Sequence, residues 1–304
     1  MKILVTGATG FIGSNIVKEL FNLGHEIYAT HRTSSSFQKV IALKSKVNWI
    51  NTDSKNWKET IKASKIDQLI HVAWGGIEAG DRNNWDLQIK NFSLSKDYFD
   101  LAKECGFSKV IGFGSQAEYG LYDLPSSELT LPKPNDAYGA VKLMTYNYLR
   151  SIFLDSETAW YWIRVYSVFG DGENPQWLIP SVISTLLKKE DLRLTECEQE
   201  YNYLHIEDFV NYFIAIVEDD QNQSGVYNIC NKQTIILKDL LNKIAEILQV
   251  SSRYLKFGVI PYRNPQSMFI SGTNSKFMNY FPKYQELENN LTDGLIKTIR
   301  LYKK

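Results

Sequence analysis

Cysteine is scarce in this chain, which has only three in 304 residues: Cys105, Cys197 and Cys230. They lie far apart, form no Cys-x-x-Cys pair and have no histidine nearby at metal-ligand spacing. A disulfide framework and a zinc site are therefore not expected. We expect no metal centre, and we interpret each cysteine as a small buried hydrophobic residue.

Long apolar runs and an excess of charge of either sign are also lacking. No stretch approaches the roughly 18 apolar residues of a membrane span. The apolar run Ile3-Leu4-Val5 is far shorter than that of a signal peptide. Thirty-four basic and 34 acidic residues leave a net charge of zero, which gives no electrostatic case for nucleic acid or an anionic membrane. We therefore expect a cytoplasmic protein with neither as a partner.

The composition that is present, 44% hydrophobic and 22% charged, suits one large or two modest globular domains. Short apolar runs alternate with helical stretches up to residue 165. Expected strands cover residues 2–5, 26–30, 47–51, 68–73, 109–112 and 160–165, and expected crossover helices cover residues 12–23, 85–105 and 137–154. This alternation predicts an α/β fold with a doubly wound parallel sheet.

The pattern loses this regularity after Val165. Helices are expected at residues 179–188, 206–218, 237–248 and 293–302. We therefore predict one domain at residues 1–165 and a smaller, mostly helical region at residues 166–304. Segments near residues 201–230 are expected to return to the main sheet, with a further strand at Val226-Tyr227-Asn228-Ile229.

A glycine-rich turn, Thr6-Gly7-Ala8-Thr9-Gly10-Phe11-Ile12-Gly13, connects the first expected strand to the first expected helix. Glycines permit a tight turn and a close approach of the backbone to a pyrophosphate, whose charge then rests on the helix N-terminus. The strand-turn-helix context predicts a Rossmann-type dinucleotide site. The expected contacts are Gly7, Thr9, Gly10, Phe11 and Ile12.

The end of the second strand bears on which dinucleotide is bound. An NAD site usually has an Asp or Glu there for the ribose 2′-hydroxyl, but this chain reads Thr30-His31-Arg32-Thr33-Ser34-Ser35. Arg32 offers a fork of donors to a 2′-phosphate and Ser34 a hydroxyl, which favours NADP(H). If Arg32 is only a solvated loop residue, NAD(H) remains possible.

A tyrosine and a lysine stand four residues apart in Tyr138-Gly139-Ala140-Val141-Lys142, and Ser115 lies upstream. On a helix, Tyr138 and Lys142 share one face. An amphipathic helix with no catalytic role has the same spacing. If the three groups meet, one carbonyl could contact all of them: Tyr138 would exchange the proton, and Lys142 would stabilise its phenolate.

These motifs together resemble the extended short-chain dehydrogenase/reductase family, in its nucleotide-sugar epimerase, dehydratase and reductase branch, over residues 1 to about 300. Asp53, His71-Val72-Ala73-Trp74, Asn91 and Arg164 to Gly170 add to the likeness. The resemblance implies that Lys142 also binds the cofactor ribose and that the Ser115 hydroxyl steadies the carbonyl or alkoxide oxygen. Further cofactor contacts that it implies are Asp53, Ser54, Val72, Ala73, Trp74, Asn91, Tyr166 and Val168.

The likeness also bears on the substrate. Where dehydratases of the family have Asp and Glu, this chain has Gln116 and Ala117, so dehydration is not expected and Glu118 is interpreted as structural. Many relatives have a second diphosphate-binding arginine where this chain has Tyr201, which weakens the case for a nucleotide sugar. His205 is interpreted as structural. The implied substrate contacts are Gln116, Ser167, Trp177, Leu178, Tyr201 and Arg263.

The leading hypothesis is an NADPH-dependent reductase of the 4-keto group of a dTDP-, CDP- or GDP-linked 4-keto-6-deoxyhexose, serving deoxysugar and surface polysaccharide biosynthesis. A nucleotide-sugar 4-epimerase with retained NAD(P), a reductase of other carbonyls, and a non-catalytic dinucleotide-binding sensor or scaffold are the alternatives. The resemblance implies a homodimer formed through residues 85–105 and 137–154. The apolar faces of these helices could equally pack within one chain.

Overall fold

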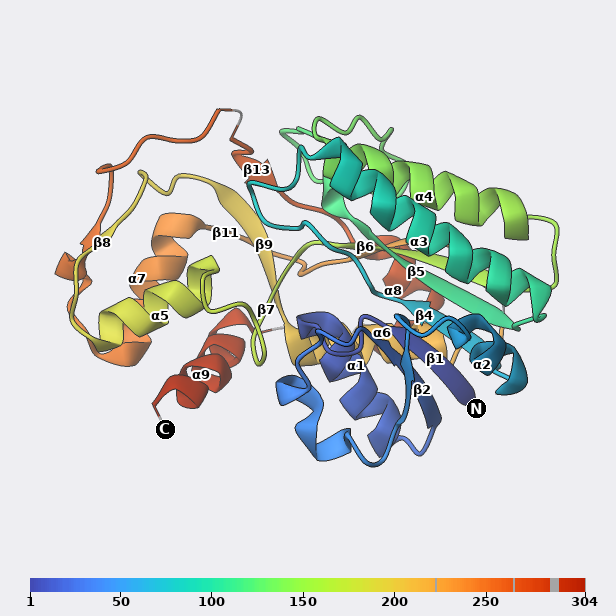
Figure 1. Cartoon of the computed structure of the whole chain (residues 1–304). Coiled ribbons are helices and arrows are strands. Elements are labelled where there is room, and N and C mark those ends of the chain that lie inside the picture. The colour runs from blue at the N-terminus through green and yellow to red at the C-terminus, as the bar shows by residue number, and fades with distance from the viewer. Residues whose placement is uncertain (222, 265, 285–289, 304) are drawn as a thin grey trace. The chain divides into compact units, whose positions relative to one another are not determined.

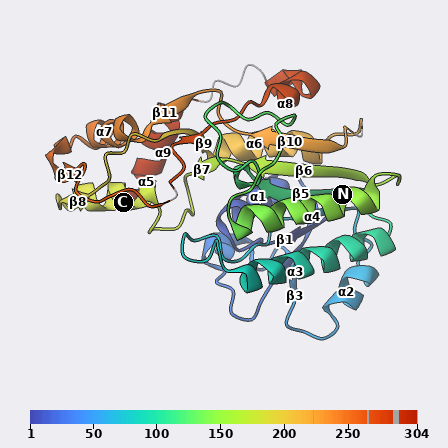
Figure 2. The ribbon, with the colours of Figure 1, turned by 90° about the horizontal axis from the view of Figure 1, so that it is seen from above.

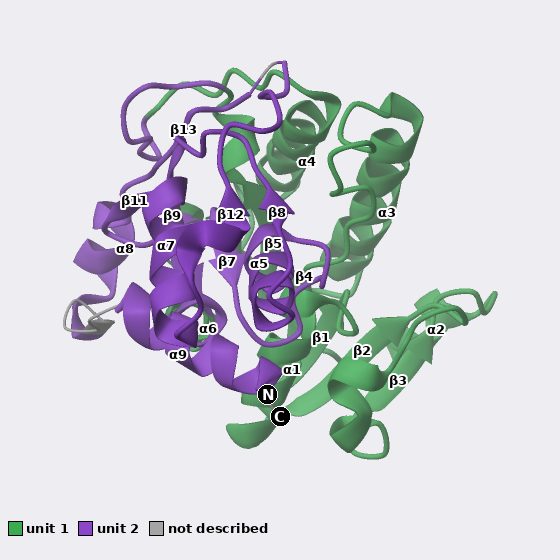
Figure 3. Cartoon of the chain, turned by 90° about the vertical axis from the view of Figure 1, so that its left-hand side faces the viewer, with its two compact units in different colours: residues 1–120, 130–165, 210–227 green, residues 121–129, 166–209, 228–304 purple. Residues whose placement is uncertain are grey.

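The computed structural model of the chain describes residues 1–221, 223–264, 266–284 and 290–303 (Figure 1). The chain forms two compact units, and it enters each of them more than once (Figure 3). Unit 1 comprises residues 1–120, 130–165 and 210–227, and unit 2 comprises residues 121–129, 166–209 and 228–304.

Unit 1 is built on a seven-stranded sheet. Its strands, in spatial order, are β10 (Gly225–Ile229), β6 (Ala159–Val165), β5 (Lys109–Ser115), β4 (Gln68–His71), β1 (Lys2–Thr6), β2 (Glu26–His31) and β3 (Asn48–Asn51). Strands β1 to β6 pair in parallel. The predicted Rossmann-type α/β fold is confirmed, and the further strand expected at residues 226–229 is β10. Strand β4 ends at His71, two residues earlier than predicted.

Helices cover both faces of this sheet (Figure 2). One face is covered by α2 (Trp57–Ala63), α3 (Trp85–Glu104) and α4 (Ala137–Phe153), and the other by α1 (Phe11–Asn22) and α6 (Ile206–Val217). Alternate strand residues, such as Leu4, Leu69 and Val110, pack into one core with α2, α3 and α4. Complete burial of each such side chain contributes about 1.5–3 kcal/mol. Among the described helices, none is both long enough and apolar enough to cross a bilayer.

The strand order places the glycine turn at a switch point of the sheet. The chain leaves β1 toward β2 and β3 and then crosses back to β4 on the other side of β1. The carboxyl ends of β1 and β4 are therefore neighbours, and the loops that follow them diverge. Open α/β sheets bind ligands at such a crevice.

Lys109, at the start of β5, binds residues 210–227, the last segment of the chain that belongs to unit 1. Its Nζ is buried and donates to the carbonyl oxygens of Ile216, Val217 and Asp219 at 2.9, 2.8 and 2.6 Å. Ile216 and Val217 end α6, so their carbonyls would otherwise lack helical partners, and Asp219 lies just beyond the helix. Burial lowers the pKa of Lys109 to about 8.

Unit 2 contains two small sheets, three of the expected helices and a short helix that was not expected, whereas most of the helix expected at residues 206–218 belongs to unit 1. The expected helices are α5 (Leu178–Leu187), α7 (Leu237–Leu248) and α9 (Leu291–Tyr302), and the short one is α8 (Ser275–Tyr280). In one sheet β9 (Glu200–His205) pairs with β7 (Ser167–Phe169), β11 (Thr234–Ile236) and β13 (Phe269–Ile270), and in the other β8 (Leu192–Arg193) pairs with β12 (Leu255–Lys256). Of the segments expected to return to the main sheet, β9 instead joins the smaller one. Most strands of these two sheets have only two or three residues, which is too few to show an alternation of apolar and polar residues in the sequence.

Candidate active site

The glycine turn after β1 has the geometry that a pyrophosphate requires. Gly7 has a φ of +66°, and a Cβ there would lie 2.8 Å from the backbone nitrogen of Ala73. A Cβ on Gly13 would lie 2.2 Å from the Gly7 carbonyl oxygen. Gly10 is the N-cap of α1, with no side chain capping the helix. The turn therefore brings bare backbone to a helix N-terminus, which fits a dinucleotide phosphate. The predicted contacts Thr9, Phe11 and Ile12 lie in this same segment.

A buried polar chain ties β1 to β4 beneath this turn. Thr6 Oγ1 accepts from the backbone nitrogen of Ala73 at 3.1 Å and lies 2.9 Å from His71 Nδ1. His71 Nε2 lies 2.9 Å from Ser95 Oγ. Burial lowers the pKa of His71 to about 3, so the ring is neutral at physiological pH. The chain fixes the start of the Val72-Ala73 segment against the glycine turn.

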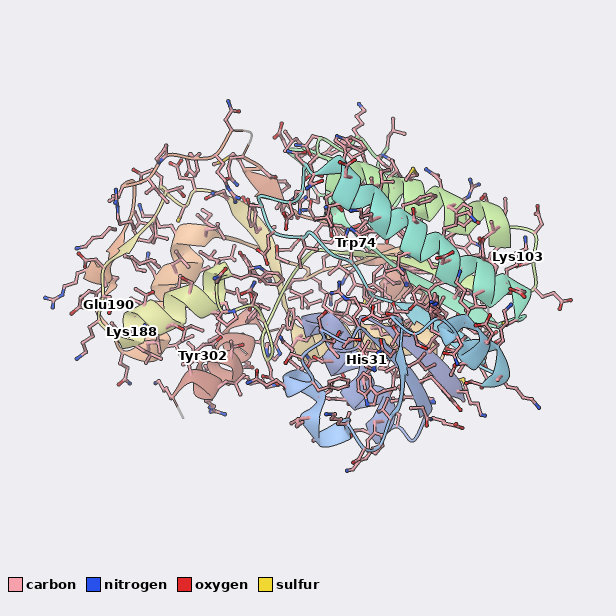
Figure 4. All side chains as sticks on the ribbon, in the orientation of Figure 1. His31, Trp74, Lys103, Lys188, Glu190 and Tyr302 are labelled. Atoms are coloured by element: carbon pink, nitrogen blue, oxygen red, sulfur yellow. The ribbon has the colours of Figure 1, made fainter. Side chains whose placement is uncertain are left out.

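Asn91 and Trp74 shape the loop that follows β4. Asn91 accepts from the backbone nitrogen of Gly75 and donates to its carbonyl, both at 2.9 Å. Trp74, labelled in Figure 4, donates from Nε1 to Gln88 Oε1 at 2.9 Å. The Asn91 amide is therefore hydrogen-bonded to the backbone of Gly75. Asn91 would contribute to a cofactor site by fixing the position of this loop.

The end of β2, where Figure 4 labels His31, forms a turn over residues 32–35. Ser35 Oγ accepts from the Arg32 nitrogen at 3.0 Å, and Asp53 accepts from the Thr33 nitrogen at 2.7 Å. Hydrogen bonds from Thr33, with the Arg32 charge as a smaller cause, lower the pKa of Asp53. Arg32 and Ser34 are exposed beside it. The nearby Ser54 hydroxyl bonds to Asn56.

The structure places Tyr138 and Lys142 on α4 and brings Tyr138 close to Ser115. Ser115 ends β5, and its hydroxyl hydrogen-bonds to Tyr138 in the first turn of α4. The first turn of α4 packs against a 3-10 helix at Gln116–Glu118, and only glycine fits at position 139: a Cβ there would lie 2.4 Å from the Ala117 carbonyl oxygen. This close contact brings the phenol and the hydroxyl together.

Burial dominates the electrostatics of the trio. It lowers the pKa of Lys142 to about 7 and raises the pKa of Tyr138. Lys142 Nζ donates to the Phe113 carbonyl at 2.5 Å and lies 3.6 Å from the Trp74 ring centroid, but 5.8 Å from that of Tyr138. The sequence assigned stabilisation of the phenolate to Lys142. In the structure the cation that opposes the rise in the Tyr138 pKa is Arg82.

Arg82 is the group near Tyr138 that the sequence did not reveal. Its Cζ lies 4.4 Å from the Tyr138 ring centroid, and its Nη2 lies 2.7 Å from Asp136 Oδ2. No local pattern links a loop arginine to a helix that begins more than 50 residues later, so only the fold could reveal this pair.

Glu118 has the structural role expected of it. Its side chain is 0% exposed, its Oε1 accepts from the Ser115 nitrogen and its Oε2 accepts from Arg164 Nε, both at 2.8 Å. Trp162 also donates to it. Both carboxylate oxygens are engaged, so Glu118 holds the backbone of Ser115 in place. Gln116, two residues before it, is half-buried.

The candidate residues of unit 2 fall on several elements. Tyr166 is buried against Gly272, where a Cβ would lie 2.3 Å from its ring and hydroxyl. Ser167 and Val168 form β7, Trp177 is the N-cap of α5, and Leu178 is the first residue of that helix. His205 ends β9, buried beside Phe169, as expected for a structural histidine.

Tyr201 and Arg263 belong to one polar cluster of unit 2. The Tyr201 hydroxyl donates to the Ser267 carbonyl at 2.6 Å and accepts from Gln266 at 3.0 Å. Burial raises the pKa of Tyr201, and the charge of exposed Arg263 opposes that rise. Position 201, where the resemblance implies a second arginine in many relatives, therefore holds a half-buried phenol close to the Arg263 cation.

Comparison with known protein families identifies the family of this chain. The model of the NAD dependent epimerase/dehydratase family matches residues 3–230, three quarters of the chain. The chain belongs to this family. It is an NAD(P)-dependent enzyme of the extended short-chain dehydrogenase/reductase type.

The names of several similar proteins describe enzymes that act on sugar nucleotides. It is 24% identical over 287 residues to dTDP-6-deoxy-L-talose 4-dehydrogenase (NAD(+)) of Aggregatibacter actinomycetemcomitans, covering 90% of this chain and 99% of the relative. It is 25% identical over 255 residues to dTDP-4-dehydro-6-deoxyglucose reductase of Escherichia coli, covering 80% of each. The fold matches UDP-glucose 4-epimerase of Thermotoga maritima with a TM-score of 0.87 at 19% identity, over 100% of this chain and 99% of the other.

Proposed function

We propose that this enzyme reduces the 4-keto group of a nucleotide-linked 4-keto-6-deoxyhexose with NADPH, in deoxysugar and surface polysaccharide biosynthesis. One observation carries the proposal: among the described residues around Ser115, Tyr138 and Lys142, no carboxylate is placed for elimination. Gln116 and Ala117 follow Ser115, and the next carboxylate, Glu118, is buried with both oxygens engaged. Such a site suits proton and hydride exchange at one carbonyl rather than loss of water.

The chemistry assigned to the trio balances as a two-electron reduction. When bound, the nicotinamide would supply the hydride that the carbonyl carbon receives. Tyr138 transfers its phenolic proton to the carbonyl oxygen, and the Ser115 hydroxyl donates a hydrogen bond to the same oxygen as negative charge develops there. Lys142 would hold the cofactor ribose through its Nζ, as the resemblance implies. The product is the 4-hydroxy sugar, and Tyr138 regains a proton from solvent.

The proposed preference for NADPH rests on Arg32 and Ser34, which are exposed at the end of β2. The nearby carboxylate Asp53 already accepts from the Thr33 backbone. A guanidinium and a hydroxyl in this place suit a 2′-phosphate better than a bare 2′-hydroxyl. Gly7, Thr9, Gly10, Phe11 and Ile12 would cradle the diphosphate.

The proposed substrate class rests on the names of the relatives and on unit 2. We assign cofactor binding to residues 1–165 and substrate binding to the region 166–304. Trp177 and Leu178 would contact the nucleotide, Arg263 its diphosphate, and Gln116 and Ser167 the sugar. Tyr201, whose hydroxyl donates to the Ser267 carbonyl, would lie beside the diphosphate as a neutral group in place of a second cation, which favours a weaker hold on the diphosphate than two arginines would give.

The test is to mix the purified protein with NADPH and, in turn, dTDP-, CDP- and GDP-4-keto-6-deoxyhexoses. Oxidation of NADPH is followed by absorbance and the product by mass spectrometry. We expect turnover with one nucleotide series and a mass gain of two hydrogens. No cofactor oxidation across the panel would refute the proposal.

The same experiment separates the competing functions. A 4-epimerase would retain its cofactor through purification and convert a 4-hydroxy sugar nucleotide without net consumption of NADPH. A sensor or scaffold would bind NADPH but leave every substrate unchanged, with wild type and Tyr138→Phe behaving alike.

A further inference from the structure

Three contacts tie the loop segment Arg82-Asn83 to the first turn of α4, and two of them join Arg82 to Tyr138. The guanidinium Cζ lies 4.4 Å from the ring centroid. The Arg82 carbonyl accepts from the Tyr138 nitrogen at 2.9 Å. Neighbouring Asn83 accepts from the Ala137 nitrogen at 3.2 Å through its side chain. The loop is thus tied to the first turn of α4 by both its backbone and its side chains.

Asp136 fixes the guanidinium and the helix together. Its Oδ2 accepts from Arg82 Nε at 2.8 Å and lies 2.7 Å from Nη2, and its Oδ1 accepts from the Gly139 nitrogen at 2.7 Å as the N-cap of α4. One carboxylate therefore sets the position of Arg82 relative to the turn that carries Tyr138. The Arg82 side chain is 30% exposed and that of Asp136 is 15% exposed, so water screens this pair only in part.

The other charged groups around Tyr138 do not take this role. Asp136 and Glu118 are negative and disfavour a phenolate. Lys142 donates to the Phe113 carbonyl and lies over the Trp74 ring. The Ser115 hydroxyl hydrogen-bonds to Tyr138 but is neutral. A cation over an aromatic ring is attracted to its electron-rich face, and more strongly when the ring carries the charge of a phenolate.

We propose that Arg82 is a positioning residue that stabilises the Tyr138 phenolate during proton transfer, held in place by Asp136. The inference rests on the proposed role of Tyr138 as proton donor. It adds a cation from the loop after β4 to the Ser115, Tyr138 and Lys142 set. Arg82 acts through the ring of Tyr138 and needs no contact with the substrate.

The first test removes the charge with Arg82→Gln and keeps it with Arg82→Lys. We expect the pH midpoint at which Tyr138 ionises to rise by about one unit in Arg82→Gln, since losing a cation disfavours the phenolate. In Arg82→Lys the rise should be smaller, because the charge remains while the planar stack and fork are lost. Arg150→Gln, an exposed arginine in the last turn of α4, removes the same charge and should leave the midpoint unchanged.

The midpoint is measurable without knowing the substrate. Protein labelled with 3-fluorotyrosine at its 18 tyrosines is titrated by ¹⁹F NMR, and the Tyr138 resonance is identified by its absence in Tyr138→Phe. Circular dichroism confirms that each variant is folded at each pH. If the keto-sugar panel fails but the midpoint shifts, the proposed substrate is wrong and the role of Arg82 stands.

Three outcomes would overturn the inference. The Tyr138 midpoint could be the same in wild type and in folded Arg82→Gln. Arg82→Gln and the control Arg150→Gln could shift the Tyr138 midpoint by the same amount. With an active substrate, Arg82→Gln could raise KM while leaving kcat and the pH profile unchanged, which would make Arg82 a substrate-binding group.

Discussion

Burial controls the charge of individual residues in this site more than any ion pair does. It moves His71, Tyr138 and Lys142 toward their neutral forms. A buried ionisable group becomes charged only where a partner offsets its lost hydration. Arg82 and the Ser115 hydroxyl are the groups that act in this way on Tyr138. The chemistry of the trio is therefore sensitive to single neighbouring side chains.

Replacing Tyr138 by phenylalanine tests the proton donor. We expect kcat to fall by about 10²- to 10⁴-fold, because general acid catalysis is lost. The thermal midpoint should change little, since only one hydroxyl is removed. Tyr148→Phe is the matched control: this tyrosine lies on the same helix with its hydroxyl on Asp100, and its loss should leave kcat unchanged. Equal kcat in Tyr138→Phe and wild type would contradict the assignment.

Lys142 should make stability depend on pH in the alkaline range. Its pKa is about 7 in the folded protein against 10.5 ordinarily, so the unfolded chain binds more protons between these values. The free energy of unfolding contributed by this group therefore rises with pH across that window. We expect the difference in unfolding free energy, wild type minus Lys142→Met, to increase from pH 7 to pH 10. Urea titrations at constant ionic strength measure it, and a difference independent of pH would refute the expectation.

Among the elements of the candidate site, the first turn of α4 contacts several of the other segments. Asp136 caps it, Gly139 lets it approach the Gln116–Glu118 turn, and Arg82 packs against it. Glu118 braces the same turn through Arg164. The geometry of the trio thus depends on the contact between two backbone segments as well as on the catalytic side chains.

Gly139→Ala tests that contact. At an exposed position inside a helix, alanine stabilises the helix by about 1 kcal/mol relative to glycine. At position 139, however, the added methyl group would lie 2.4 Å from the Ala117 carbonyl oxygen. We expect a loss of about 1–3 kcal/mol of stability and a lower kcat. Asn147→Ala, at an exposed position of α4, should instead stabilise slightly. A Gly139→Ala variant as stable and active as wild type would show that the close packing is not needed.

At the scale of the whole molecule, each compact unit is assembled from separate stretches of chain. Unit 1 gathers three segments around one sheet, and Lys109 links the last of them to β5. The glycine turn, the end of β2 and the trio all belong to this unit. Cofactor binding should therefore stabilise the whole of unit 1 against unfolding.

The proposed cofactor preference predicts different stabilisation by two ligands. A ligand that binds only the folded state adds about 2.7 kcal/mol at 100 times its Kd. We expect NADPH to raise the thermal midpoint more than NADH at equal concentration, and Arg32→Gln to remove the difference. Lys103→Gln, labelled in Figure 4 at the far end of α3, should preserve it. Equal stabilisation of the wild type by both cofactors would refute the NADPH preference.

By itself, the sequence determined the features that depend on near neighbours along the chain. Apolar runs predicted the strands of the main sheet, glycines at residues 7 to 13 predicted the phosphate turn, and the four-residue spacing predicted that Tyr138 and Lys142 share a face. Such patterns constrain the backbone directly, so they can be interpreted without a structure. Their ends were less certain, as at β4, because hydrogen bonding decides where a strand stops.

Only the tertiary structure decided which distant groups meet. Arg82 reaches Asp136 across 54 positions, and Glu118 reaches Arg164 across 46. It also decided that β9 joins a small sheet while β10 joins the large one. These contacts leave no periodic trace in the sequence, because they arise where the strand order brings separate segments together. The electrostatics of Tyr138 depend on them, since burial and a charge from another loop set its pKa.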